Sequence, residues 1–194
     1  MISEEHNCVF VHINKVAGTS FRKFLNDPDW VNNPHITANQ YIEKIGREKF
    51  DSYFSFAFVR NPWDRAVSSF NFRKQNSKFP LPNDYSFKKF VKKSKIIFSG
   101  NQLDYISEEP WLWDKATRQY TYKPDTKIIV DFIGKFENLE HDVNYVKGKL
   151  GIKKDFPHDN KTHHKHYREY YDEDSKQMVF DKCQRDIEYF GYKF

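Results

Sequence analysis

The chain has 194 residues, which is long enough to bury an apolar core without metals or disulfide bonds, and we interpret residues 1–194 as one domain. Lys and Arg exceed Asp and Glu by 32 to 27, and the net charge of +5 favours an anionic ligand, while interspersed charges argue against a nucleic-acid-binding arm. Neither a secretory leader nor an apolar run of ~18 residues is present, so we expect no membrane segment and no secretion.

The first predicted elements are a strand, a tight loop and a helix. The strand is the apolar run Val9–Ile13, and Phe21, Phe24 and Leu25 recur at helical spacing after the loop. The loop carries Lys15, Gly18, Thr19 and Ser20 into the helix N-terminus. An ammonium, hydroxyl groups and free backbone N–H groups together favour a phosphate or a sulfate.

A second helix is predicted over Ala38–Phe50, with His35 just before it, and a second strand over Tyr53–Val59. The turn Arg60-Asn61-Pro62 ends this strand, and Pro62 suits the first turn of the helix that follows. Ser68 lies on that helix. Because parallel strands bind ligands at their carboxyl ends, we expect Lys15 and Arg60 to meet over one ligand.

The second half of the sequence is predicted to contain a short basic helix over Ser86–Lys95 and an irregular segment, Ile96–Thr121, which is typical of a functional loop. A core strand over Lys127–Gly134, a helix from Leu139 that Gly151 ends, and a last helix from Glu169 or Asp172 to Phe190 follow. The alternation of strands and helices predicts an α/β domain with a parallel sheet.

Several residues allow two interpretations. Trp111 and Trp113 are typical of a core or of a stacking surface for a sugar. The histidines His158, His163, His164 and His166 lack ligand spacing for zinc, and a basic ligand-facing loop is the preferred interpretation. The chain has 2 cysteines, Cys8 and Cys183, which favours a reduced, cytoplasmic protein, with a Cys8–Cys183 disulfide as the alternative.

The motifs resemble those of sulfotransferases that use 3′-phosphoadenosine 5′-phosphosulfate (PAPS). FVHINKVAGTSF is similar to their 5′-phosphosulfate loop and FAFVRNPWDRAVSSF to their 3′-phosphate element. VDFIGKFENLEHD and the terminal stretch from His166 resemble the carbohydrate (Golgi-type) sulfotransferase group. Asn14 and Val16 stand where that family often has Pro and Thr, and no membrane anchor is evident.

The resemblance implies a P-loop-like three-layer domain, with a central parallel sheet flanked by helices, that transfers a sulfuryl group from PAPS to a hydroxyl group of a saccharide or similar acceptor without a metal. Lys15 would contact the 5′-phosphosulfate and stabilise charge on the leaving oxygen. His35 would be the base, with Glu43 or Glu48 as the alternatives. The implied donor contacts are Ala17, Gly18, Thr19 and Ser20 at the 5′ end, Arg60 and Ser68 at the 3′-phosphate, and Lys161, Lys165, Tyr167 and Arg168 closing over the donor.

Two other functions stay open at this stage. A P-loop kinase would use ATP and magnesium, but its G-K-[ST] order is absent, since Lys15 precedes Gly18. A non-catalytic nucleotide- or nucleic-acid-binding module would bind its ligand without transfer.

Overall fold

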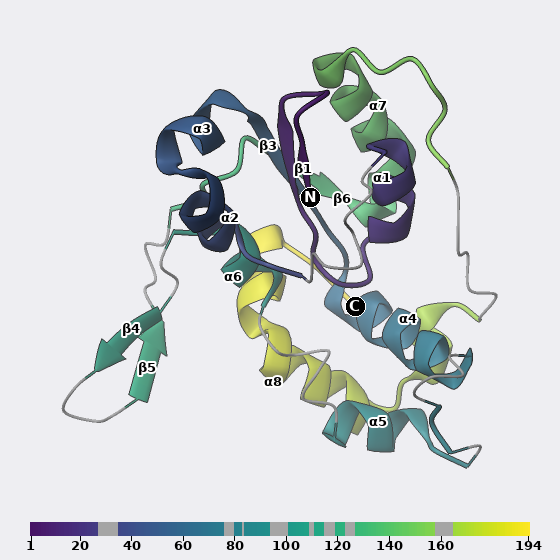
Figure 1. Ribbon diagram of the computed structural model, residues 1–194. Coiled ribbons are helices and arrows are strands. Elements are labelled where there is room, and N and C mark those ends of the chain that lie inside the picture. Colours follow the sequence, from purple (N-terminus) through teal and green to yellow (C-terminus); the bar gives the residue numbers. More distant parts are fainter. Residues whose placement is uncertain are drawn as a thin grey trace.

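A mixed four-stranded sheet lies at the centre of the protein, in the order β1-β2-β3-β6 (Figure 1). The computed structural model describes residues 1–26, 35–75, 80–82, 84–93, 101–108, 111–114, 119–122, 127–157 and 165–194. The strands are β1 (Ile2–Ser3), β2 (Cys8–Val11), β3 (Phe54–Val59) and β6 (Phe132–Lys135). β2, β3 and β6 are parallel, and β1 pairs antiparallel with β2. The predicted α/β class is confirmed, and the expected all-parallel sheet is corrected at the β1 edge.

Helices cover both faces of this sheet (Figure 1). One face carries α1 (Gly18–Phe24) and α7 (Leu139–Leu150). The other carries α2 (Ala38–Ile45), α3 (Arg47–Ser52) and α6 (Gln102–Ile106). Beyond the end of β3, a group of helices packs together: α4 (Pro62–Gln75), α5 (Phe87–Lys93) and α8 (Glu173–Phe190). The 3₁₀ helices are η1 (Phe136–Asn138) and η2 (Tyr167–Tyr170).

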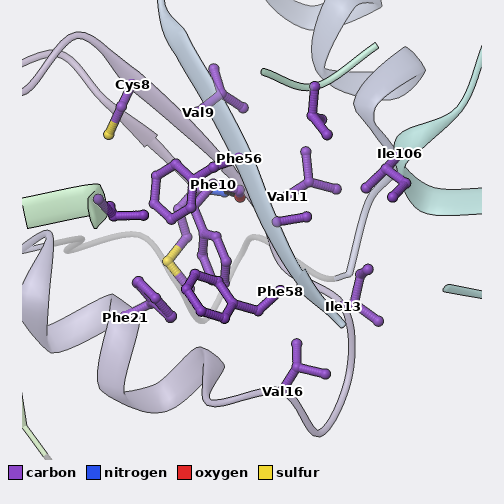
Figure 2. Close-up of a cluster of buried hydrophobic side chains, with 14 of the residues drawn as sticks. Cys8, Val9, Phe10, Val11, Ile13, Val16, Phe21, Phe56, Phe58 and Ile106 are labelled. Atoms are coloured by element: carbon purple, nitrogen blue, oxygen red, sulfur yellow. Dashed lines mark hydrogen bonds between the residues drawn. The ribbon is translucent and has the colours of Figure 1, made fainter. Parts of the chain in front are cut away.

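Phenylalanine rings fill the space between the sheet and α1. Phe10 of β2 lies 4.5 Å from Phe21 of α1 and 5.1 Å from Phe56 of β3, measured between ring centroids, and Phe21 lies 4.7 Å from Phe58. All of these side chains have no exposed surface. In Figure 2 these rings lie on one side of β3, and Val11 and Ile106 lie on the other. The period of two in the strand sequences therefore decides which residues face α1.

Three predicted elements differ from the observed ones. The helix expected over Ala38–Phe50 is two helices, because Gly46 between them has φ 84° and ψ 148°. The strand expected over Lys127–Gly134 begins only at Phe132, since Ile128 forms an isolated bridge with Ser107 instead of pairing with β3. The segment Ile96–Thr121, expected to be irregular, contains α6 and one strand of the hairpin β4 (Trp111–Asp114) and β5 (Gln119–Tyr122).

The helix ends follow the sequence more closely. α4 begins at Pro62, and α7 ends where Gly151 adopts φ 65°. Asp172 caps α8 by accepting a hydrogen bond of 2.8 Å from the backbone N–H of Ser175. Breakers and caps are local signals, and they locate these boundaries without knowledge of the packing.

Both cysteines are free and buried, so the alternative of a Cys8–Cys183 disulfide is wrong. Among the described residues, no helix is long and apolar enough to cross a membrane.

Gly134 of β6 provides a test of the core. A Cβ atom at this position would lie 2.4 Å from Cε1 of Phe58, whose ring is fully buried. We expect Gly134→Ala to lower the free energy of unfolding by about 1–3 kcal/mol through overpacking. Urea denaturation followed by circular dichroism measures this change.

Gly148→Ala is the matched control, since a Cβ atom there would meet nothing within 4 Å on an exposed turn of α7. This variant should raise the free energy of unfolding by roughly 0.5–1 kcal/mol, because Ala favours a helix more than Gly does. Equal stabilities of the two variants would contradict the packing described for Phe58.

Candidate active site

The carboxyl ends of the parallel strands bring distant segments together. Val11 of β2 pairs with Ala57 of β3, and Val59 of β3 pairs with Lys135 of β6, so the segments that follow these strands leave the same edge of the sheet. The contact between the Arg60 guanidinium and the Phe136 ring, at 4.0 Å from the ring centroid, shows how close they lie. This edge is where ligands bind in open parallel sheets.

The first of these segments has an unusual backbone. Lys15 has φ 69° and Ala17 has φ 63°, while Val16 between them has no positive φ. Left-handed geometry is costly for residues with a side chain, by an amount on the order of 1 kcal/mol or more for each, and it is found where function requires it. Alternation of this kind turns successive N–H groups toward one point and forms an anion-binding concavity.

Gly18 is required by the close approach of His12. A Cβ atom on Gly18 would lie 1.6 Å from Nε2 of the His12 ring. The imidazole of His12 therefore packs directly on the backbone at the start of α1 and supports the loop that carries Lys15. No side chain at position 18 fits unless the histidine moves.

Lys15 lies among groups that disfavour its positive charge. Burial is the main cause, and Arg60 adds to it; together they lower the pKa of Lys15 from 10.5 to about 8. Its Nζ atom lies 3.9 Å from the centroid of the Phe72 ring, a cation–π contact made by α4. An anion bound beside Lys15 would replace part of the lost hydration and raise this pKa again.

Arg60 is held on three sides. Its Nε donates to Oδ2 of Asp64 at 2.8 Å, and its Nη1 donates to the backbone oxygen of Lys15 at 3.3 Å. Phe136 covers one face of the guanidinium. The expected meeting of Lys15 and Arg60 at one edge of the sheet is observed, and Asp64 offsets the charge of Arg60 only in part.

His35 lies at the same edge, next to His12. Its Nδ1 is 3.1 Å from the backbone oxygen of His12, and the two ring centroids are 4.3 Å apart. Partial burial is the main cause that lowers the pKa of His35 below 6.5, and the charge of Lys15 lowers it further. The alternative bases Glu43 and Glu48 are exposed on α2 and α3.

The remaining predicted residues are placed less directly. Thr19 and Ser20 lie in the first turn of α1, and Ser68 is buried on α4. Arg168 donates to the backbone oxygen of Phe194 at 2.8 Å. The ring of Tyr167 lies 5.7 Å from that of Phe194, so these two residues gather at the chain's last residue instead of at Lys15.

Other predicted residues of this terminal region give less. Lys165 is exposed and lies 4.0 Å from Glu169. Lys161 lies outside the described residues, as do His158, His163 and His164. Within the described ranges, no three His, Cys, Asp or Glu side chains are grouped as metal ligands would be. That Lys161, Lys165, Tyr167 and Arg168 close over the donor stays a prediction.

The sequence interpretation missed His12, Asp64 and Phe72. His12 could have been found as the polar residue in the apolar run Val9–Ile13. The spacing of four residues between Arg60 and Asp64 is that of an ion pair on one helix face, although Arg60 precedes α4. Phe72 carries no such signal, since one aromatic residue on a helix is ordinary.

Comparison with known proteins gives consistent results. The model of the sulfotransferase family matches residues 1–193. Carbohydrate sulfotransferase 11 of Rattus norvegicus is 25% identical over 190 residues, covering 78% of this chain and 53% of its own length. Carbohydrate sulfotransferase 9 of Homo sapiens is 26% identical over 239 residues, covering 98% of this chain and 52% of its own length.

Two further similarities complete the comparison. An uncharacterised protein of Archaeoglobus fulgidus is 36% identical over 109 residues, 56% of this chain and 77% of that protein. The crystal structure of mouse sulfotransferase SULT7A1 complexed with PAP shares the fold, with a TM-score of 0.55, 14% identity and coverage of 95% of this chain and 86% of that chain. The chain spans about half the length of the carbohydrate sulfotransferases it matches. On the match over residues 1–193, the chain belongs to the sulfotransferase family.

Proposed function

We propose that the protein transfers the sulfuryl group of PAPS to a hydroxyl group of a carbohydrate. The observation that carries this proposal is the meeting of Lys15, Arg60 and His35 at one edge of the sheet in a member of the sulfotransferase family. PAPS bears a 5′-phosphosulfate and a separate 3′-phosphate. Two cations from different strand ends match a ligand with two separated anionic groups.

The reaction is an in-line displacement at sulfur. The acceptor oxygen forms a bond to sulfur, and the bond between sulfur and the bridging oxygen of the phosphosulfate breaks. The electron pair of that bond stays on the bridging oxygen and gives 3′,5′-adenosine bisphosphate. Lys15 donates a hydrogen bond to this oxygen as its negative charge grows, which stabilises the transition state more than the bound donor.

His35 accepts the proton of the acceptor hydroxyl through Nε2. A backbone oxygen can only accept, so the contact of 3.1 Å between His35 Nδ1 and the oxygen of His12 requires the proton on Nδ1. In the neutral ring, Nε2 then carries the lone pair. Because the pKa of His35 lies below 6.5, the ring is neutral at pH 7.

Arg60 and Ser68 bind the 3′-phosphate in this proposal, and the segment from Ala17 to Ser20 supplies donors to the 5′ end. The strained backbone at Lys15 and Ala17 supports the second assignment. The carbohydrate acceptor rests on the curated relatives, which are carbohydrate sulfotransferases. The cytoplasmic location stays a prediction.

The function is tested by sulfation assays with PAPS and a panel of saccharides. Lys15→Ala should lower kcat by roughly 10²–10³-fold, because it removes the donor to the leaving oxygen. Lys149→Ala, on an exposed turn of α7, is the control and should keep full activity. A protein that binds 3′,5′-adenosine bisphosphate but sulfates nothing would be a non-catalytic nucleotide binder and would refute the proposal.

The pH dependence of kcat/KM should have two limbs. The protonated form of Lys15 binds the donor, so kcat/KM should fall above pH about 8, where free Lys15 loses its proton. It should also fall at acid pH, below the lowered pKa of His35, where the base becomes protonated. In Lys15→Arg the alkaline limb should move beyond the measurable range, since Arg stays charged; an unchanged limb would assign it to another group.

His35→Gln should lower kcat by roughly 10²–10⁴-fold and leave the affinity for 3′,5′-adenosine bisphosphate unchanged, since it removes only the base. Calorimetric titration of the nucleotide measures the affinity. His141→Gln, exposed on α7, is the matched histidine control. Near-normal turnover in His35→Gln would exclude His35 as the base.

A further inference from the structure

Gln102, the first residue of α6, is paired with the backbone of Arg60. Its side chain has no exposed surface. The Oε1 atom accepts from the backbone N–H of Arg60 at 2.8 Å, and Nε2 donates to the backbone oxygen of Arg60 at 2.8 Å. One amide side chain thus satisfies both backbone groups of a single residue.

This pair replaces a missing strand neighbour. β3 ends at Val59, and its ladder with β6 ends at the pair Val59–Lys135. The backbone of Arg60 therefore leaves the sheet at a buried position, where unpaired N–H and C=O groups are costly. The Gln102 amide supplies one acceptor and one donor, as a neighbouring strand would, and so fixes the direction in which the Arg60 side chain leaves the backbone.

Gln102 is itself held by α8. The carboxylate of Asp186, which has no exposed surface, accepts from the backbone N–H of Gln102 at 2.8 Å and from that of Leu103 at 3.0 Å. Arg65 of α4 lies 3.8 Å from the same carboxylate. Burial raises the pKa of Asp186, and Arg65 opposes that rise. The start of α6 is thereby fixed relative to α4 and α8.

We propose that Gln102 is a positioning residue that aims Arg60 at the 3′-phosphate of the donor and thereby sets the preference for 3′-phosphorylated nucleotides. This inference rests on the proposed function. Arg60 has few other means of choosing its direction, because its contacts with Asp64 and Phe136 begin beyond the backbone. A loss of the amide frees the Arg60 backbone to turn, and the guanidinium moves with it.

The experiment compares the affinities of two nucleotides, 3′,5′-adenosine bisphosphate and adenosine 5′-monophosphate, by calorimetric titration. The ratio of the two affinities reports the 3′-phosphate contact alone, because both nucleotides share the 5′ end. Gln102→Met keeps the length of the side chain and removes the amide. We expect it to lower the ratio by about tenfold or more, the scale of one hydrogen bond to a charged group.

Ser55→Ala is the matched control for a general loss of stability. Ser55 is a buried polar residue of β3 that bonds to Asp131 at the opposite end of the strand. Its variant should lower the unfolding temperature and leave the ratio unchanged. In an Arg60→Met background, Gln102→Met should have no further effect on the ratio, because the residue that it positions is absent.

The outcomes separate the inference from the function on which it depends. If the wild-type protein binds both nucleotides equally, the proposed function fails, and the inference fails with it. If the wild type prefers the 3′-phosphorylated nucleotide and Gln102→Met keeps that preference, only the inference is overturned. Should Gln102→Met not fold, Gln102→Asn, which retracts the amide by one methylene, must lower the ratio in its place.

Discussion

Two positive charges held close together, on Lys15 and Arg60, are the constraint on which the rest of this site depends. The guanidinium of Arg60 donates to the backbone oxygen of Lys15, and its charge adds to the burial that lowers the pKa of Lys15 to about 8. Asp64 pairs with Arg60 at 2.8 Å but leaves Lys15 without relief. A bound anion relieves this repulsion, so affinity for the donor is already present in the empty site as unfavourable electrostatic energy.

The surrounding residues keep these charges in place by means that differ on the two sides. On the Lys15 side, the imidazole of His12 packs against Gly18, and the backbone is held in left-handed geometry. On the Arg60 side, Gln102 and Asp186 satisfy buried backbone groups. The first arrangement is steric and the second is made of hydrogen bonds, and each is expensive to alter because the groups involved are buried.

The sequence predicted the elements whose causes are local. The strand before Lys15, the turn at Arg60 and the start of α4 at Pro62 follow from apolar runs and breakers, and the meeting of the two cations followed from strand order. The break at Gly46, the late start of β6 and the role of Gln102 did not follow. Each depends on a partner far along the chain, as with Gln102 and Arg60, and no local pattern carries that information.

The same distinction explains why the donor can be inferred further than the acceptor. PAPS carries fixed charges, and fixed charges require cations at stated strand ends, which a short motif can encode. A neutral hydroxyl group on a sugar requires shape and apolar surface, and these come from long-range packing. Phe72 illustrates this, since its exposed ring lies 3.9 Å from Lys15 Nζ, yet nothing in its sequence neighbourhood distinguishes it from a core residue. The charge of the donor is thus written in short motifs, whereas the fit to the acceptor arises only in the folded chain.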